Sequence, residues 1–425
     1  MKKIIIINMA VCDQCLVSGV NFIIAIMLAR CMYPSEYGLF IFATTCLVLT
    51  SGLFSSIIGI SMNILGPNSS QKEWEVLFLN CFGVLLTLML GLIMMFFCLY
   101  WIMRTGAYAA NAQAFTTLAL VVPLTLGHDF FRNAQLSRLN IKGALLTDIA
   151  THGSRILIIY LLTISPQLSN QKVLWIYGIS AALGITVGYS SIRPQFSKLT
   201  QAISSTILSK IWASSKWTFA DWIPFVLYGY LYIFIVTFVL GNEKTGVLGA
   251  CRNIIAPIVM LQVGISSFLL PYFCRLLASK GHEAMLTSLI KILISLAFVI
   301  LLYLTIVNLF AGEIMRVFFS HYASYTYLVL LFSVGIFINY SFKIAEIYLL
   351  ATVRPKFIFM ARILAAIPAV ILCYPLVKTY GINGGGYSYI VSNLLMCASM
   401  LAFMLYSLRE YEPEYTYNPI GNFEK

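Results

Sequence analysis

Twelve apolar stretches, each long enough to cross a bilayer, occupy almost all of this 425-residue chain. A hydrocarbon core roughly 30 Å thick needs about 20 apolar residues in a helix. Only 10% of the residues are charged, against about a quarter in soluble domains. Lipid-exposed backbone must satisfy its own hydrogen bonds, so the sequence predicts an all-α integral membrane protein. The predicted spans are 5–29, 38–65, 76–101, 114–138, 142–164, 172–192, 217–240, 247–274, 285–310, 322–351, 357–379 and 384–408.

The distribution of basic residues predicts the orientation of these spans. Of the 27 Lys and Arg residues, 17 fall in polar segments on the same side as the N-terminus and six in the alternate segments. Short loops rich in Lys and Arg stay on the cytoplasmic side, so both termini are expected there. The net charge of +12 then reflects membrane topology, and no nucleic-acid partner is expected. The remaining four basic residues lie within spans: Arg155, Arg252, Lys343 and Arg362.

The chain divides into two halves of equal length around a polar stretch. The predicted parts are an N-terminal six-helix bundle at 1–192, a cytoplasmic linker at 193–216, a C-terminal six-helix bundle at 217–408 and a cytoplasmic tail at 409–425. Asp13 precedes Gly38 by 25 residues, and Asp221 precedes Gly246 by 25 residues. An even number of spans per half predicts a parallel repeat about an axis along the membrane normal. Two such bundles with a central cleft indicate a transporter that works by alternating access.

No cofactor or metal is expected. Cys12 and Cys15 have the spacing of metal ligands, but the sequence offers no second pair of Cys or His to complete the site. The other cysteines are scattered along the chain and are interpreted as small apolar packing residues. The chain has no GxxxxGK[ST] segment and therefore no ATPase of its own.

Charged side chains inside the spans are the best candidates for a site, because a charge at the bilayer centre costs at least about 2.5–3.5 kcal/mol. Arg155 is the strongest single candidate, since it lies near mid-membrane on the same helix face as Asp148. A guanidinium binds phosphate or carboxylate in a fork, although a structural pair with Asp148 is the alternative. Lys343 and Glu346 repeat this pattern in the tenth span, where they could instead pair with each other.

The remaining candidates have similar alternatives. His128 and Asp129 in the fourth span could titrate during proton exchange, unless Asp129 merely neutralises Arg132. Asp13 and Asp221 could instead be solvated near the membrane surface, and Arg30 and Arg362 could instead reach the interface along their side-chain stems. The predicted substrate-binding residues are Arg155, Arg252, Lys343, Arg362 and Arg30. The predicted residues for proton coupling or gating are Asp13, Asp221, Asp129, His128, Asp148 and Glu346.

The first span and the turn after it contain a recognisable set of residues: Asp13-Gln14, Ser18, Asn21-Phe22, Leu28-Ala29-Arg30 and Pro34-Ser35-Glu36-Tyr37-Gly38-Leu39-Phe40. This segment resembles the opening of polysaccharide-export flippases, and the length and the 6+6 span arrangement agree. These flippases are the Wzx-type O-antigen branch of the multidrug/oligosaccharidyl-lipid/polysaccharide (MOP) exporter superfamily.

The resemblance implies a function and a set of partners. The substrate would be an oligosaccharide repeat unit on undecaprenyl pyrophosphate, moved to the periplasmic leaflet of a bacterial inner membrane. Membrane lipids, a polysaccharide polymerase and a chain-length regulator are the further partners implied. The resemblance also implies a cavity lined largely by the first two helices of each half, which are spans 1, 2, 7 and 8 here.

Two other functions compete with this one. A multidrug antiporter of the same superfamily would favour carboxylates in its cavity, and the four cations within spans argue against it. A membrane glycosyltransferase or O-antigen polymerase would need catalytic residues on a substantial periplasmic loop. Every predicted outward loop is about twelve residues or shorter, so we expect no enzyme.

Overall fold

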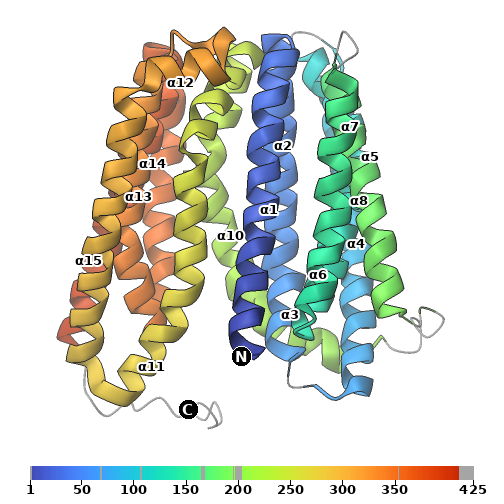
Figure 1. The fold of residues 1–425 in the computed structure, drawn as a ribbon, viewed down its shortest axis with the longest axis vertical. Coiled ribbons are helices and arrows are strands. Elements are labelled where there is room, and N and C mark those ends of the chain that lie inside the picture. Colours follow the sequence, from blue (N-terminus) through green and yellow to red (C-terminus); the bar gives the residue numbers. More distant parts are fainter. Residues whose placement is uncertain are drawn as a thin grey trace.

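The computed structural model describes residues 2–67, 69–105, 108–163, 168–194, 196, 203–352 and 354–410. Side chains are not described for 2–12, 15, 263–268, 271, 278 and 344. Every regular element in the described part of the chain is helical, as the sequence predicts. The helices form two side-by-side bundles, shown in blue to green and in yellow to red in Figure 1.

The N-terminal bundle holds six helical rods, two of which contain a short π-helical turn. These turns are η1, between α2 and α3, and η2, between α6 and α7, and the rods continue through them. The elements are α1 (Lys2–Cys31), α2 (Pro34–Phe54), η1 (Ser55–Gly59), α3 (Ile60–Leu65), α4 (Gln71–Met103), α5 (Ala109–Ser137), α6 (Ile141–Asp148), η2 (Ile149–Gly153), α7 (Ser154–Thr163) and α8 (Asn170–Ile192).

The C-terminal bundle contains one element of 68 residues, α11, that is two helices in sequence. Gly281 interrupts it with φ 82° and ψ 179°, a conformation that glycine adopts without steric cost. The elements are α10 (Ser205–Leu240), α11 (Asn242–Leu309), α12 (Ala311–Phe318), η4 (Ser320–Tyr322), α13 (Thr326–Ala351), α14 (Pro355–Tyr380) and α15 (Ile382–Arg409).

Eleven helical stretches of the described chain are long and apolar enough to cross a membrane. The first helix, α1, adds a shorter apolar stretch, Leu16–Cys31. These stretches correspond in order to the twelve predicted spans. The protein is therefore a multi-pass membrane protein. We call the end where α1 begins and α15 ends the inner end, because the sequence predicts that it is cytoplasmic, and the opposite end the outer end.

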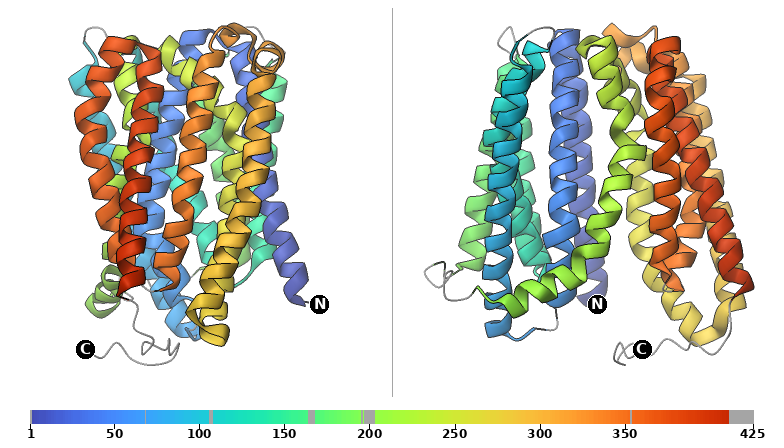
Figure 2. Two further views of the ribbon diagram at one scale, coloured as in Figure 1. Left: turned by 90° about the vertical axis from the view of Figure 1, so that its left-hand side faces the viewer. Right: turned by 180° about the vertical axis from the view of Figure 1, so that it is seen from behind.

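Helix α10 begins inside the segment that the sequence predicts as a linker. It starts at Ser205, twelve residues before the predicted seventh span, whereas residues 195 and 197–202 of the linker lie outside the described part. Ile211 is buried against the N-terminal bundle, and the Ser61 hydroxyl donates to the Ile211 carbonyl at 3.2 Å. Figure 2 shows α10 curving from beneath the N-terminal bundle into the C-terminal one. The predicted tail, 409–425, lies outside the described residues beyond Glu410.

The two bundles meet at the outer end. Asn111 and Asn242 exchange side-chain hydrogen bonds of 3.0 and 3.2 Å, and the rings of Tyr37 and Tyr322 lie 5.7 Å apart. A Cβ atom on Gly38 would lie 1.6 Å from the Asn242 carbonyl oxygen. The absence of a side chain on Gly38 is therefore what lets α2 and α11 approach so closely.

The bundles separate towards the inner end. In Figures 1 and 2, α11, α13, α14 and α15 diverge there from the N-terminal bundle, and α10 connects the two. Contacts of the inner half of α10 hold it to the N-terminal bundle, including a hydrogen bond of 2.6 Å from the Thr218 hydroxyl to the Ser56 carbonyl. The helix backbones of the two bundles consequently lie close together at the outer end and further apart at the inner end (Figures 1 and 2).

Replacing Gly38 by alanine tests the outer contact. We expect Gly38→Ala to lower the free energy of unfolding by about 1–3 kcal/mol, because the new methyl group overlaps the backbone of α11 and forces the helices apart. The midpoint of thermal unfolding in detergent measures this. Gly91→Ala is the matched control, since its Cβ has no heavy atom within 4 Å. Equal midpoints for the two variants would contradict the prediction.

Candidate functional site

Two adjoining cavities lie between and within the bundles. One, of about 550 Å³, is lined mostly by α1, α2, α5 and the helices from α6 to α8, and we call it the N-cavity. The other, of about 740 Å³, is lined by α2 and by α10, α11, α13, α14 and α15, and we call it the C-cavity. Both are bounded by Ile41, Thr44, Val48 and Asn253, so the two cavities are neighbours across α2 and α11.

The lining extends beyond the helices that the family resemblance implies. Spans 1 and 2 contribute to the N-cavity, but so do the fourth, fifth and sixth spans through Asp129, Asp148 and Tyr177. In the C-cavity, Lys343 and Arg362 come from the tenth and eleventh spans. The expectation of a cavity lined largely by spans 1, 2, 7 and 8 is thus too narrow for this chain.

A buried network of charges ties three helices of the N-terminal bundle together. Arg132 on α5 donates from Nη2 to Asp13 Oδ2 on α1 at 2.7 Å and from Nε to Asp148 Oδ2 on α6 at 2.6 Å. His128 Nε2 lies 3.2 Å from the other oxygen of Asp148, and its Nδ1 lies 3.2 Å from Asp129. Asp148 is 0% exposed, so this pairing is what allows a carboxylate at that depth.

The turn between α5 and α6 positions this network. Asn140 caps α6 by accepting from the Gly143 backbone N–H at 3.1 Å, and the Gln135 amide donates to the Thr147 hydroxyl across the turn at 3.3 Å. These bonds hold the last turns of α5 against the first turns of α6. Arg132 and Asp148, which are 16 residues apart in the chain, are thereby brought side by side.

The C-terminal bundle has a corresponding network. Arg362 on α14 donates to Asp221 on α10 and, from Nη2, to Glu346 Oε1 on α13 at 3.0 Å. Lys343 donates to the second oxygen of Glu346 from one turn earlier on α13. The structure therefore places Lys343 and Glu346 in the along-helix pair that the sequence left as an alternative, and it adds Arg362 as a second partner of Glu346.

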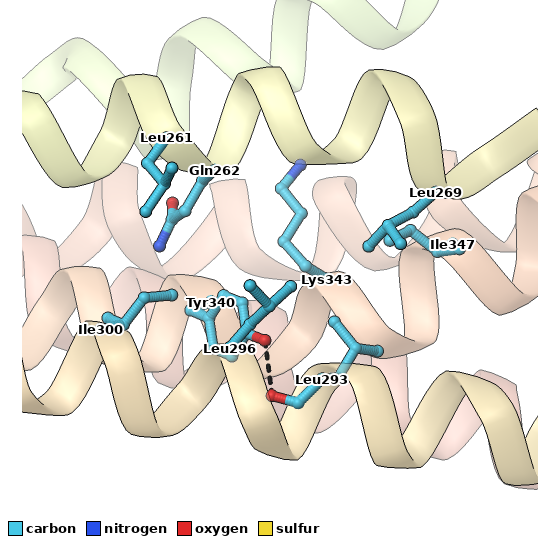
Figure 3. A pocket seen from close by; sticks show the side chains of 9 residues that line it. All are labelled: Leu261, Gln262, Leu269, Leu293, Leu296, Ile300, Tyr340, Lys343 and Ile347. Carbon is cyan, nitrogen blue, oxygen red and sulfur yellow. Dashed lines mark hydrogen bonds between the residues drawn. The ribbon is translucent and has the colours of Figure 1, made fainter.

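Lys343 also borders a narrow apolar pocket. In Figure 3 its amino group extends from α13 towards the part of α11 that carries Leu261 and Gln262. One turn away, the Tyr340 hydroxyl donates to the Leu293 carbonyl at 2.6 Å. Tyr340 thus fastens α13 to the later part of α11, and Lys343 is left facing the earlier part.

Arg155 has a different environment from the arginines above. It is 6% exposed, its Nε donates to the Ser180 hydroxyl at 3.2 Å, and its guanidinium carbon lies 3.9 Å from the centre of the Tyr177 ring. The alternative pairing with Asp148 is not formed, because both oxygens of that carboxylate face Arg132 and His128. Arg155 lines the N-cavity.

Arg252 is the corresponding cation of the C-cavity. Its guanidinium carbon lies 5.7 and 5.8 Å from the ring centres of Tyr230 and Tyr232. In the described part of the chain, no carboxylate lies within 4 Å of the charged atoms of Arg252 or Arg155. A guanidinium over an aromatic ring keeps its remaining N–H donors available for an anion.

Seven of the eleven predicted residues line the two cavities. Asp13, Asp221 and Glu346 do not line them but are bonded to the lining arginines Arg132 and Arg362, and Arg30 lies apart. Arg30 lies at the outer end, where it donates to the carbonyl of Val317 on α12, and it is absent from the lining of both cavities as described. Arg362 and Asp13 are paired within their bundles, so the alternatives of interfacial snorkelling and surface solvation are not what the structure shows. The roles of the predicted residues remain predictions.

Arg132 is the site residue that sequence reasoning missed. It was counted with the cytoplasmic segments, because it falls near the end of its span, and it was considered only as a partner of Asp129. In the structure it pairs with Asp13 and Asp148. A signal was available, since Arg132 and Asp148 have the same 16-residue spacing as Glu346 and Arg362.

Metal binding has no support in the described residues. They contain no group of three or more His, Cys, Asp or Glu side chains placed to hold an ion. The side chains of Cys12 and Cys15, which have metal-like spacing, lie outside those that the structure describes.

Known proteins resemble this chain in structure but not detectably in sequence. No family model matches the chain, and no curated protein matches its sequence. A solved structure of an inward-facing MATE family multidrug resistance transporter of the MOP superfamily matches with a TM-score of 0.70 and 12% identity, over 95% of this chain and 94% of the other. The chain has the MOP transporter fold.

Two further structures show the breadth of that fold. The lipid II flippase MurJ, in an inward closed conformation, matches with a TM-score of 0.72 and 13% identity over 96% of this chain and 88% of MurJ. A MOP superfamily transporter from Pyrococcus furiosus, described by the reverse polarity of its binding pocket, matches with a TM-score of 0.66 and 12% identity over 96% of each chain. Binding pockets of different polarity therefore occur on this fold.

Arginines that are bonded to carboxylates and arginines that are not should respond differently to truncation. We expect Arg132→Ala to lower the free energy of unfolding by about 3–5 kcal/mol, because Asp13 and Asp148 lose their counter-charge while remaining buried. Arg155→Ala removes no partner of a carboxylate and should cost less. Thermal unfolding midpoints in detergent compare the two variants.

Neutralising both acids gives the internal control. Adding Asp13→Asn and Asp148→Asn to Arg132→Ala should recover part of the lost stability, since no uncompensated carboxylate remains. A lower unfolding midpoint for Arg155→Ala than for Arg132→Ala would contradict the prediction, because the ionic bonds of Arg132 would then contribute less to stability than the contacts of Arg155.

Proposed function

We propose that this chain is a flippase that moves undecaprenyl-pyrophosphate-linked oligosaccharide repeat units of O-antigen or a related surface polysaccharide. Transport would run from the cytoplasmic to the periplasmic leaflet of a bacterial inner membrane by alternating access. The observation that carries the proposal is the pair Arg155 and Arg252, which line the adjoining cavities without a carboxylate partner in the described chain. The other cations of the cavities are bonded to acids of their own bundle.

The chemistry of the cavities suits such a headgroup. A pyrophosphate carries several oxygens that accept from guanidinium N–H groups, and Arg binds phosphate in a two-point fork. Arg252 lines the C-cavity together with the aromatic side chains of Phe225, Tyr228 and Tyr389, and the Tyr230 and Tyr232 ring centres lie 5.7 and 5.8 Å from its guanidinium carbon. Aromatic faces and hydroxyl groups together provide an amphipathic surface on which sugar rings can lie.

The shape of the molecule supports entry from the cytoplasm. The bundles are closed by the contacts at Gly38 and Asn242 and diverge at the inner end, which the basic residues predict to be cytoplasmic. In alternating access the bundles rock about a site near the membrane midplane. The headgroup would enter at the inner end, bind Arg155 and Arg252, and leave when the outer contacts open, while the polyprenyl tail stays in lipid.

A second candidate is a cation-coupled multidrug antiporter. The N-cavity supports it, since Asp129 and Asp148 line that cavity and carboxylates suit organic cations. MATE family multidrug transporters share the fold. The antiporter and the flippase differ in the charge of the ligand, and this makes them separable by experiment. A membrane enzyme acting on lipid-linked sugars stays the least supported alternative.

Reconstitution in liposomes tests the proposal. Purified protein should move the host's own undecaprenyl-pyrophosphate oligosaccharide between leaflets faster than protein-free liposomes do, measured by accessibility of the sugar to an added glycosidase. The assay with and without a pH gradient identifies proton coupling. Movement of an organic cation such as ethidium, without movement of the lipid-linked sugar, would favour the antiporter and reject the flippase.

Variants of the two arginines connect the activity to the site. We expect Arg155→Ala and Arg252→Ala each to lower the rate of sugar movement by about tenfold or more, since each removes charge-assisted hydrogen bonds worth about 1.5–3 kcal/mol. Arg104→Ala is the control, because Arg104 lies outside both cavities over the Trp101 ring. A full rate in both cavity variants would contradict the assignment.

A further inference from the structure

Two helix pairs, one in each bundle, are built to the same register. In the N-terminal bundle α5 ends at Ser137 and α6 begins at Ile141, and in the C-terminal bundle α13 ends at Ala351 and α14 begins at Pro355. Each boundary is separated from its counterpart by 214 residues. Positions 214 apart in these helices are therefore structurally equivalent.

The charges at three equivalent positions are inverted between the bundles. Asp129 corresponds to Lys343, Arg132 to Glu346, and Asp148 to Arg362. In every case an acid in one bundle matches a base in the other. Hydropathy alone does not require this pattern, because either sign of charge is costly within a membrane.

In each bundle the residues at two of the three positions bond to each other. Arg132 bonds to Asp148 and Arg362 bonds to Glu346, so the same two positions are joined with donor and acceptor exchanged. In both bundles the arginine also bonds to an aspartate on the first helix, Asp13 or Asp221. The inversion leaves these internal networks complete.

The third position faces the central space. The side chains of Asp129 and Lys343 are 26% and 29% exposed, and each lines the cavity of its own bundle. Asp129 accepts from the Ser51 hydroxyl at 2.7 Å and lies 3.2 Å from His128 Nδ1, while Lys343 donates to Glu346. In the described chain no Lys or Arg side chain lies within 4 Å of the Asp129 carboxylate, so it can accept from a charged partner that approaches it.

Contacts at the outer end show how equivalent positions meet. Gly38 is 208 residues before Gly246, and Pro34 is 208 residues before Asn242. A Cβ on Gly38 would meet the Asn242 carbonyl oxygen, and one on Gly246 would lie 3.0 Å from the Pro34 carbonyl oxygen. The two contacts are reciprocal, as a two-fold axis between the bundles requires.

We propose that Asp129 and Lys343 form an ion pair between the bundles that closes the inner end in the outward-facing conformation. The inference rests on the alternating access of the proposed function. When the bundles tilt in opposite senses, related by this two-fold axis, and open the outer end, equivalent positions at the inner end approach each other. Identical charges at such positions would repel, whereas the inverted charges attract.

The inversion thus gives the closed inner end a specific bond. Asp13 and Asp221 have the same charge at corresponding places in the two halves, but each is neutralised by an arginine of its own bundle. Asp129 and Lys343 instead line the cavities, where Asp129 contacts Ser51 and His128 and Lys343 is bonded to Glu346 on its own helix. Separating them on return to the present conformation costs less in a wet cleft than in lipid, so the pair can form and break in each cycle.

Cross-linking tests the pair without any substrate. In a cysteine-free background, Asp129→Cys with Lys343→Cys should be linked by a short bifunctional thiol reagent, because irreversible capture accumulates a minor conformation. Asp129→Cys with Asn339→Cys, one turn further out on α13, is the matched control and should link more slowly.

A second link at the outer end shows whether the conformations exclude each other. Asn111→Cys and Asn242→Cys replace two residues that are hydrogen-bonded in this structure, and their disulfide should hold the outer end closed. We expect this disulfide, once formed, to prevent the 129–343 link. Formation of both links in one molecule would overturn the proposal, as would failure of the 129–343 pair to link faster than its control.

Charge exchange provides a second measure that does not depend on cysteine at these two positions. Thr44 lines both cavities, so labelling of Thr44→Cys by an impermeant thiol reagent from the outer side reports the outward-facing population. Asp129→Lys or Lys343→Asp alone should lower this labelling by about tenfold, and the two together should restore it.

The same labelling separates this inference from the proposed function. Absence of restoration in the double variant would reject the ion pair even if the lipid-linked sugar is moved. Restored labelling in a protein that moves no lipid-linked sugar would retain the pair and reject the flippase. Asp129→Glu and Lys343→Arg, which preserve both charges, should label as the unmodified protein does.

Discussion

The high cost of an unpaired charge in a low-dielectric interior organises this molecule. Asp148 is fully buried, and it can be so because Arg132 and His128 face its two oxygens. The network then extends to α1 through Asp13. In the C-terminal bundle Arg362 performs the same task for α10, α13 and α14. Each bundle is consequently fastened at its inner third by ionic bonds among three helices, which lets it move as one body.

This internal pairing also decides which cations remain for a ligand. Arg132, Lys343 and Arg362 are bonded to carboxylates of their own bundle. Arg155 and Arg252 are instead held by aromatic rings and, for Arg155, a hydroxyl group. An aromatic face does not use the guanidinium N–H groups, so these two side chains, which line the cavities, keep donors available for an anion. The arginines bonded to acids and the two that we propose to bind substrate therefore differ in their partners, not in residue type.

The contacts between the bundles have a different physical character. At the outer end, Gly38 and Gly246 bring two backbones together, and neutral amides add hydrogen bonds. Such contacts depend on shape and can part without leaving buried charges unpaired. Neutral contacts of this kind suit the outer end under the proposed alternating access, because an interface that opens must cost less to separate than the ionic bonds within each bundle.

The sequence predicted the fold well, because hydropathy reports directly on transfer into lipid. It located the spans and the pairs Asp13 with Gly38 and Asp221 with Gly246 at matching spacing. It misjudged the start of α10, since the segment around Ile211 has a polar composition and becomes buried only against the neighbouring bundle. It also assigned Arg132 to a cytoplasmic segment, because proximity to a helix end gives no information about a partner 119 residues away on α1.

The sequence by itself determined that the chain crosses a membrane many times, that its charged residues there are few, and which residue types could bind an anion. Only the tertiary structure decided which of those charges neutralise one another and which face a cavity. The physical reason is that transfer into lipid is a local property, summed over some 20 residues of one helix. The pairing of Arg132 with Asp13, or the freedom of Arg155 from Asp148, depends on distances between helices that no local property contains.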